Sequence, residues 1–340
     1  MKNRVKIVLF TEINSKLGSP FLRVLSAHPL VELKAVVTSP KDVLCNYFVN
    51  DTTQVDVETE AEALGVMVLR PDRVNAPEVI DALTDIGPDY LIVANFQQLL
   101  KSRLLATAGI AAINFHPSPL PRYAGLAPFY WIIRNGDRQS SISVIKMDEG
   151  LDTGPIIMQR QIPLREGETS LSLRTLQEEQ NILMLLELIP LLASGSFTCM
   201  PQDLKQRTYF GLPAEDDYFL DFSLSAKSVL NQIRAGYRYP GSYFFLEDGT
   251  RVVVLTAALA TDHPMQGPGI PGGVVHTSRG TFISTADGWL QLLTVDVQGV
   301  EAPVSAINLP GMVLDTSEIS ADAVLPVNSD THRPGIQPLI

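Results

Sequence analysis

The first 195 residues alternate short apolar runs with amphipathic stretches, and this pattern restricts the possible folds more than any other feature. The apolar runs predict strands over residues 5–10, 32–38, 66–69, 90–94, 111–115 and 141–147. The stretches between them predict helices over residues 21–27, 57–64, 76–83, 101–107 and 127–135. Strands that alternate with helices in this way pair in parallel, with helices on both faces of the sheet. We therefore predict an α/β fold with a doubly wound, mainly parallel sheet.

The rest of the chain follows a different pattern. An apolar stripe predicts a long helix over residues 169–192, with Pro190 and Gly195 marking its end. After a segment with little apolar periodicity, the sequence predicts a helix over residues 225–235 and short strands over residues 243–246, 251–259, 273–276, 280–284 and 289–297. These strands favour a second, smaller β-barrel domain. We predict an α/β domain, a linker, a small β-barrel domain and a tail, over residues 1–195, 196–217, 218–315 and 316–340 respectively.

The charge of the chain bears on its partners. The net charge is −11, which argues against a broad basic surface for nucleic-acid phosphates. From residue 200 onward, 8 Lys and Arg stand against 15 Asp and Glu, which gives 8 − 15 = −7 for that part. Composition therefore makes a nucleic acid the less favoured partner.

The sequence shows neither a membrane segment nor a metal site. Its apolar runs are shorter than the ~20 residues that a membrane-spanning helix requires, and Lys6 interrupts the first of them. Cys45 and Cys199 lie far apart, which favours a reducing compartment over a disulfide framework. No metal-ligand spacing relates the cysteines to the histidines His28, His263, His276 and His332. We expect a soluble, cytoplasmic protein without a metal.

The segment from Ile113 to Gly154 contains the candidate chemistry. Asn114 and His116 stand two residues apart near the C-terminal end of a predicted strand, so their side chains leave the same face. Open α/β sheets bind ligands at that edge. Asp152 follows in a tight, glycine-bounded loop after the next strand. An amide, an imidazole and a carboxylate can therefore converge there.

Such a trio suits the transfer of an acyl group to an amine. The imidazole can remove a proton, the carboxylate can orient the imidazole, and the amide can polarise the acyl oxygen. No nucleophilic side chain is needed. A competing interpretation makes Asn114 and Asp152 ordinary turn residues and His116 a polar group at a strand end, and any one of the three alone favours that interpretation.

Taken together, these residues stand in a recognisable context. The string INFHPSPLPRYAGLAP with GLDTG downstream resembles the folate-dependent formyltransferases, a family that includes methionyl-tRNA formyltransferase, glycinamide ribonucleotide formyltransferase, sugar N-formyltransferases and the hydrolase domain of 10-formyltetrahydrofolate dehydrogenase. The resemblance covers residues 5–195 and, more weakly, residues 215–310. It implies a Rossmann-like formyltransferase fold, a related C-terminal barrel, and catalytic roles for Asn114, His116 and Asp152.

The resemblance also implies a site for the formyl donor, 10-formyltetrahydrofolate. In the family, the pteridine lies between the segment after the buried fourth strand and the loop before the catalytic aspartate. The corresponding segments here run from Asn95 to Leu100, with Leu105, and from Met147 to Gly150. The residues predicted to hold the donor are Phe96, Gln98, Leu100, Leu105, Met147, Asp148 and Gly150. For Leu100 and Leu105 a place in the hydrophobic core is an equally good interpretation.

The acceptor is predicted from two departures. The tRNA enzyme resembles this chain except that it has a glycine-rich, basic loop after the second strand and usually an arginine before the glycine that aligns with Gly125. Here the loop over residues 39–48 has one basic residue, Lys41, and Ala124 precedes the glycine. We therefore expect a small-molecule amine, either an amino sugar nucleotide or a natural-product or siderophore-type amine, free or bound to a carrier.

Several alternatives stay open. Methionyl-tRNA is the less favoured acceptor, and a 10-formyltetrahydrofolate hydrolase would use water instead of an amine. A folate-binding protein without turnover is the non-enzymatic alternative. Aromatic residues could line an acceptor pocket, but such a cluster is more often part of a core; they are Tyr47, Phe48, Tyr123, Phe129, Tyr130 and Trp131. The sequence does not predict an oligomeric state.

Overall fold

The computed structural model describes residues 4–261, 264, 269–307 and 309. It divides into two compact units, residues 1–217 with 234–240 and residues 218–233 with 241–340. The predicted tail over residues 316–340, together with His263 and His332, lies outside the described residues.

The first unit is built on a seven-stranded sheet of order β3-β2-β1-β4-β5-β7-β8. The first five strands in this order run parallel, and they are β3 Met67–Leu69, β2 Val31–Val37, β1 Val5–Phe10, β4 Tyr90–Val93 and β5 Ala111–His116. The last two strands, β7 Gln139–Lys146 and β8 Ile156–Pro163, each pair antiparallel with the strand before them. The mainly parallel α/β sheet is confirmed.

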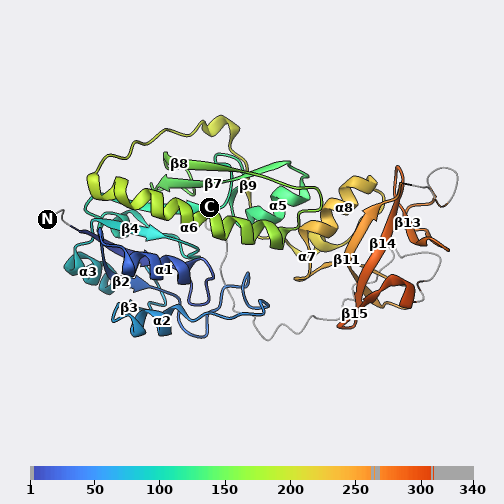
Figure 1. The fold of residues 1–340 in the computed structure, drawn as a ribbon, viewed down its shortest axis with the longest axis horizontal. Helices are drawn as coiled ribbons and strands as arrows, with labels where there is room; N and C mark the ends of the chain where they lie inside the picture. The colour runs from blue at the N-terminus through green and yellow to red at the C-terminus, as the bar shows by residue number, and fades with distance from the viewer. Residues whose placement is uncertain (1–3, 262–263, 265–268, 308, 310–340) are drawn as a thin grey trace. The chain divides into compact units, whose positions relative to one another are not determined.

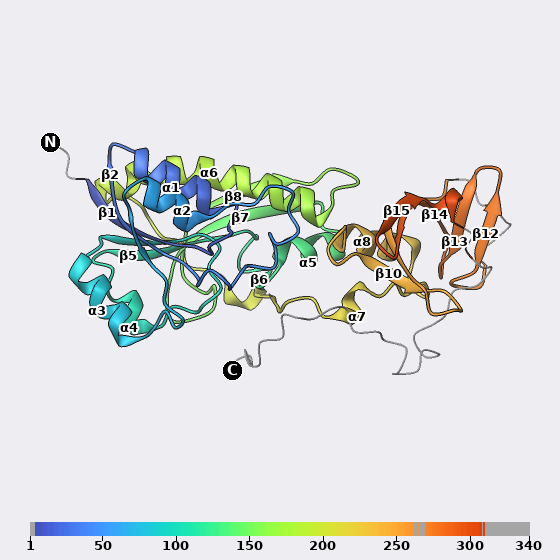
Figure 2. The same cartoon turned by 90° about the horizontal axis from the view of Figure 1, so that it is seen from below.

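Helices cover both faces of this sheet (Figures 1 and 2). One face packs against α1 Gly18–Ala27, α2 Val57–Ala63 and α6 Ser170–Ser194. The opposite face packs against α3 Pro77–Ile86 and α4 Ser102–Leu105. Because both faces are covered, the inner strands are largely apolar, and β4 is buried at every position. The C-terminal ends of the strands are left as the edge where loops gather.

The long helix α6 differs from its predicted form at one point. Thr169 begins it with a capping box to Ser172, and Gly195 ends it in a left-handed conformation with φ of 64°. The prediction that Pro190 marks the end is wrong, because the helix continues to Ser194. Ile189 and Leu192 are both buried, and their packing outweighs the hydrogen bond that the proline cannot donate.

The second unit is a smaller antiparallel β domain with one helix, α8 Ala226–Ala235. Its sheet has the order β10-β11-β14-β13-β12, and β15 also pairs with β14. The strands are β10 Ser242–Phe245, β11 Arg251–Leu259, β12 Val274–Thr277, β13 Gly280–Ser284, β14 Trp289–Val297 and β15 Val300–Pro303. Apolar residues of α8, including Val229 and Ile233, pack into one cluster with the inner face of this sheet. A second, smaller β domain is thus confirmed.

The segment expected as a linker, residues 196–217, lies with the first unit. Within it, η1 Leu204–Gln206 precedes β9 Tyr209–Phe210, and α7 Glu215–Tyr218 follows. Strand β9 pairs in parallel with β6 Ala124–Gly125 in a two-stranded sheet of their own. We call residues 200–210 the strap.

Candidate active site

The predicted catalytic residues lie at the C-terminal end of β5. Asn114 and His116 are the third-last and last residues of that strand, and Asp152 lies in the turn between β7 and β8. The Nδ1 atom of His116 lies 3.7 Å from Oδ1 of Asp152, and both side chains are largely buried, with 7% and 11% of their areas exposed. The structure therefore places an imidazole and a carboxylate side by side at the edge of the sheet.

The two ring nitrogens of His116 have different partners. Nε2 lies 3.0 Å from the carbonyl oxygen of Tyr123. A carbonyl oxygen only accepts, so Nε2 holds the hydrogen of this bond. Nδ1 is consequently the ring atom that faces Asp152 and is available to exchange a proton.

The carboxylate of Asp152 is held in place by the segment that follows the histidine. Oδ2 of Asp152 accepts a hydrogen bond of 2.9 Å from the backbone N–H of Gly125. Asp152 itself has a φ of 56°, a left-handed conformation that residues other than glycine rarely adopt. The surroundings of this turn must therefore hold it in shape.

Gly125 offers a test of this arrangement. Its φ is 100°, and a Cβ added there would overlap the carbonyl oxygen of Phe210. We expect Gly125→Ala to push β6 away from β9, to destabilise the fold by about 1–3 kcal/mol and to lower the rate of the reaction. Gly211→Ala is the matched control, because nothing lies within 4 Å of the Cβ that it would add. Urea unfolding and steady-state kinetics measure both variants, and equal behaviour of the two would contradict the expectation.

Asn114 completes the trio without a hydrogen bond of its own. Its side chain is partly exposed, and its amide has no hydrogen-bond partner among the residues that the structure describes. An amide N–H that is not engaged by the protein remains available to a substrate oxygen.

Most of the residues predicted to hold the donor meet in one apolar cluster. Phe96, Leu100, Leu105 and Met147 all pack in the cluster on the α3–α4 face of the sheet. Gln98 accepts a 2.9 Å bond from the N–H of Val74 through Oε1. Asp148 shapes the neighbouring turn, since its Oδ1 accepts bonds from Gly150 N, at 3.0 Å, and from Thr153 Oγ1, at 2.7 Å. An apolar wall thus lies beside a polar turn, as a flat heteroaromatic ring requires.

Two neighbouring residues add to this site: Asn95 begins the segment predicted to hold the donor, whereas Glu12 was not singled out by sequence reasoning. The side-chain oxygen of Asn95 is buried and has no hydrogen-bond partner among the described residues, so it fits an N–H group of a ligand. Glu12 is 3% exposed and accepts a 2.7 Å bond from the backbone N–H of Gln97. Burial raises the pKa of Glu12, while its bonds from Gln97 and Ser39 lower it. The only sequence signal for Glu12 was its place shortly after a buried strand.

Comparison with known proteins decides the family. Residues 5–188 match the formyl transferase family, and residues 214–305 match the formyl transferase C-terminal domain. The chain belongs to the formyltransferase family. It is a folate-dependent formyltransferase, an enzyme that uses 10-formyltetrahydrofolate as its formyl donor. The apolar cluster and the unpartnered oxygen of Asn95 fit such a donor.

Similar proteins fall into two groups. This formyltransferase is 33% identical over 245 residues to the methionyl-tRNA formyltransferase of Synechococcus sp. JA-3-3Ab, covering 70% of this chain and 75% of the relative. It is 35% identical to the methionyl-tRNA formyltransferase of Anaeromyxobacter dehalogenans over 252 residues, 73% of this chain and 80% of the relative. Among solved structures, the sugar 3N-formyl transferase WlaRD, with dTDP and 5-N-formyl-THF, aligns with a TM-score of 0.65 at 17% identity, covering 88% of this chain and 99% of WlaRD. The latter likeness shows the fold alone.

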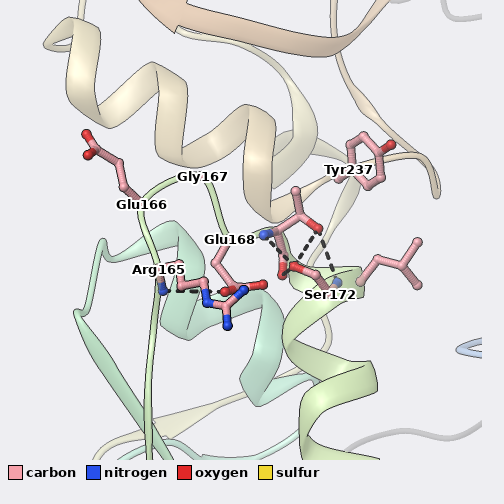
Figure 3. Close-up of a pocket in the computed structure, with 8 residues that line it drawn as sticks. Arg165, Glu166, Gly167, Glu168, Ser172 and Tyr237 are labelled. Atoms are coloured by element: carbon pink, nitrogen blue, oxygen red, sulfur yellow. Dashed lines mark hydrogen bonds between the residues drawn. The ribbon is translucent and has the colours of Figure 1, made fainter.

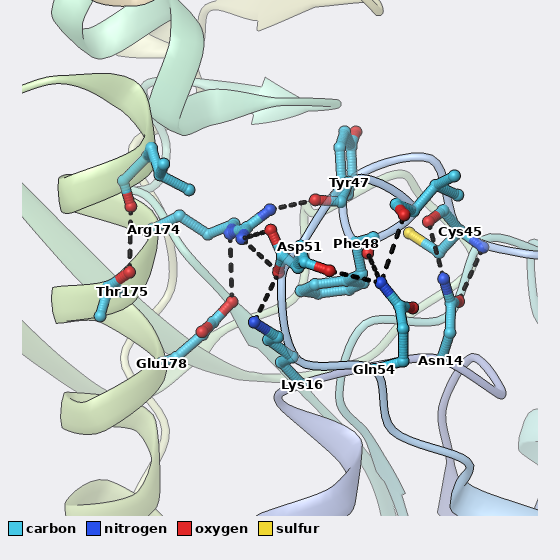
Figure 4. A network of polar contacts seen from close by, with 12 residues as sticks. Asn14, Lys16, Cys45, Tyr47, Phe48, Asp51, Gln54, Arg174, Thr175 and Glu178 are labelled. Atoms are coloured by element: carbon cyan, nitrogen blue, oxygen red, sulfur yellow. Dashed lines mark hydrogen bonds and ion pairs between the residues drawn. The ribbon is translucent and has the colours of Figure 1, made fainter. Parts of the chain in front are cut away.

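The loop between β2 and α2 of the formyltransferase is fixed by charged contacts (Figure 4). Arg174 on α6 binds both carboxylate oxygens of Asp51, at 2.6 and 2.7 Å, and also donates to the carbonyl oxygen of Tyr47. Lys16 pairs with the same carboxylate at 3.0 Å. The hydroxyl of Tyr47 accepts a 3.2 Å bond from the N–H of Ala127, two residues after Gly125. The loop is therefore tied both to α6 and to the segment that holds Asp152.

The ionisation of Glu178 in this network gives a pH-dependent expectation. Burial raises the pKa of Glu178 to about 7, with Asp51 adding to the rise and Arg174 opposing it. A carboxyl whose pKa is higher in the folded state than its ordinary value of 4.5 stabilises the fold below pH 4.5, and this stabilisation is lost as the pH rises toward 7. We expect Glu178→Gln to be more stable than the parent at pH 8 and the difference to close toward pH 4.5. Unfolding midpoints across this range test it, and a variant less stable at pH 8 would contradict it.

A pocket of about 440 Å³ lies at the N-terminal end of α6 (Figure 3). Arg165, Glu168, Thr169 and Tyr237 are among the residues that line it. None of the predicted catalytic or donor-binding residues lines this pocket, so we do not assign it to either substrate.

Among the described residues, no helix is long and apolar enough to cross a bilayer. In the same part of the chain, no group of three His, Cys, Asp or Glu side chains is arranged to hold a metal ion.

Proposed function

We propose that this formyltransferase moves the formyl group directly from 10-formyltetrahydrofolate to a primary amine, with Asn114, His116 and Asp152 as its catalytic residues. The observation that carries the proposal is the 3.7 Å approach of Asp152 to Nδ1 of His116, while Nε2 is bound to the carbonyl of Tyr123. With Nε2 committed as a donor, Nδ1 is the atom that can take the proton of the attacking amine.

Each of the three residues has a distinct task in this proposal. His116 removes the amine proton as the new C–N bond forms, and the negative charge of Asp152 stabilises the imidazolium that results. Asn114 donates a hydrogen bond to the formyl oxygen, where negative charge develops in the transition state. The bound folate would supply the activated formyl group: the bond between its N10 and the formyl carbon breaks, and tetrahydrofolate leaves. The His116 imidazolium would return its proton to the departing nitrogen. No covalent intermediate on the protein is needed. Cys45 is not a candidate nucleophile, because burial raises the pKa of its thiol to about 12 and keeps it protonated.

For the donor, we propose that the ring of the folate lies against the apolar cluster that contains Phe96 and Met147. The unpartnered oxygen of Asn95 and the backbone of the Asp148–Gly150 turn would bind its polar edge. Leu100 is 3% exposed and acts from beneath this surface by supporting it.

For the acceptor, the first candidate is methionyl-tRNA. Its support is the sequence likeness: the relatives described above are named methionyl-tRNA formyltransferases, and the alignments with them cover 70% and 73% of this chain. This differs from the small amine expected from the sequence. Binding to tRNA would be weakened by salt, because each phosphate contact releases counterions.

The second candidate is a small amine such as an amino sugar nucleotide. The specific support is electrostatic: residues 200 onward contain 8 Lys and Arg against 15 Asp and Glu, and the fixed loop over residues 39–48 contains one basic side chain, Lys41. A charged acceptor stem would find few partners on these segments, whereas a small amine needs only the end of β5.

One assay separates the candidates. Purified protein is incubated with 10-formyltetrahydrofolate and, in turn, methionyl-tRNA, dTDP-linked amino sugars and hydroxylated ornithines, while the release of tetrahydrofolate is followed by absorbance. Turnover with methionyl-tRNA that falls as salt rises would support the first candidate, and turnover with a small amine alone would support the second. Release of tetrahydrofolate without any acceptor would identify a hydrolase and overturn the proposal.

A further inference from the structure

The strap, residues 200–210, contacts both segments on which the predicted catalytic residues depend. We propose that Gln202 of the strap is the residue that positions Asp152. The inference rests on the catalytic roles proposed above for His116 and Asp152.

The side-chain amide of Gln202 binds two backbone carbonyls of the turn that contains Asp152. Its Nε2 donates to the carbonyl oxygen of Asp152 at 2.9 Å and to that of Gly154 at 2.7 Å. Asp152 is in the left-handed region, so its carbonyl direction and its side-chain direction are set together by one unfavourable backbone conformation. Two bonds from one amide therefore fix the direction in which the carboxylate points.

The oxygen of the Gln202 amide is not used in this contact. Its Oε1 atom is buried and has no hydrogen-bond partner among the described residues. A buried acceptor without a partner is unfavourable, so the side chain is held there by its donor alone. A side chain of similar length that only donates should fill the same role.

The strap also supports the histidine side of the site. Thr208 accepts a 2.8 Å bond from Tyr123 N through its hydroxyl and a 2.9 Å bond from Ala124 N through its carbonyl. The carbonyl of Tyr123 is the partner of His116 Nε2, and the next residue but one, Gly125, donates to Asp152. One short segment thus positions the backbone partners of both catalytic side chains.

A residue that only stabilises the fold would behave differently from one that positions Asp152. Loss of a purely structural residue lowers stability and affects kcat and the KM values together. Misalignment of the carboxylate lowers kcat, because the transition state depends on Asp152, whereas binding of the folate does not.

The test compares three variants in the full chain. Gln202→Met keeps the length of the side chain and removes its donor, so kcat should fall by about 10- to 100-fold with the KM for 10-formyltetrahydrofolate unchanged. Gln206→Met is the matched control in the same strap, since among the described residues the Gln206 amide bonds only to the exposed Asp203 carboxylate. Its kcat should match that of the parent. Gln202→Lys restores a donor of similar length and should recover most of the lost kcat.

The outcomes separate this inference from the proposed function. If Gln202→Met stays within about twofold of the parent in kcat while Asp152→Asn is inactive, the positioning role is overturned and the catalytic trio stands. If Gln202→Lys is as slow as Gln202→Met, the donor-only account is wrong. If Asp152→Asn keeps full activity, it is the proposed function that fails.

Discussion

Replacing His116 with alanine is expected to lower kcat by about 10²- to 10⁴-fold, the range that a general base contributes. Nδ1 is the one ring atom of His116 that faces Asp152, and Nε2 is already bound to Tyr123. The substitution removes the proton acceptor and leaves Asp152 without the cation that it would stabilise. The folate should still bind with its normal affinity, because His116 lies outside the apolar cluster predicted to hold the ring.

The control for this variant is His28→Ala, which changes a histidine in the same unit at the end of α1. Transfer is measured as tetrahydrofolate release with the acceptor that gives turnover, and folate affinity is measured separately by fluorescence titration. A His116→Ala enzyme with parent-like kcat would remove the imidazole from the mechanism. A large loss in folate affinity instead would place His116 in donor binding.

The second large effect is expected on stability. Nη2 of Arg174 bonds to both carboxylate oxygens of Asp51, and the two side chains are only 12% and 7% exposed. Removing one member of a buried pair costs about 3–5 kcal/mol when the other charge is left uncompensated. Because Lys16 still pairs with Asp51, we expect the lower end of that range, about 3 kcal/mol. Arg174→Met should therefore lower the free energy of unfolding by about this amount and release the loop that contains Tyr47.

The measurement can be restricted to the first unit. The chain has two tryptophans, Trp131 in the first unit and Trp289 in the second, so a Trp289→Phe background leaves Trp131 as the reporter of urea unfolding. Arg160→Met is the matched control, because its partner Glu187 is 54% exposed and such a pair is worth about 0–1 kcal/mol. Equal losses of unfolding free energy in the two variants would show that the buried Arg174 pair stabilises the fold no more than the exposed Arg160 pair does.

The parts of this structure that the sequence predicted are those encoded by local pattern. Buried strands such as β4 stand out because every residue is apolar, and β11 Arg251–Leu259 has the same bounds in the sequence analysis and in the structure. Asn114 and His116 could be assigned to one face because they are two residues apart in a strand. These inferences need no knowledge of which elements pack together.

The parts that sequence reasoning missed depend on contacts between distant segments. Gln202 lies 50 residues from Asp152, and Arg174 lies 123 residues from Asp51. The strap has little apolar periodicity, so it was expected as a linker, and nothing in its local pattern indicates that Phe210 stacks between Tyr123 and Trp131. Such contacts become visible only when the topology brings the segments together.

The pairing of β9 with β6 bears on how proteins of this kind can exchange parts. Suppose that recombination replaced everything after residue 195 with the corresponding part of another protein. The chain would then lose β9, which pairs with Gly125, and Gln202, whose side-chain amide bonds to the carbonyl of Asp152. A junction after Asp217 would leave both in place. The segment that must stay intact for catalysis is thus longer than the sheet and its helices. Chimaeras with junctions at the two positions should differ in activity even when both fold.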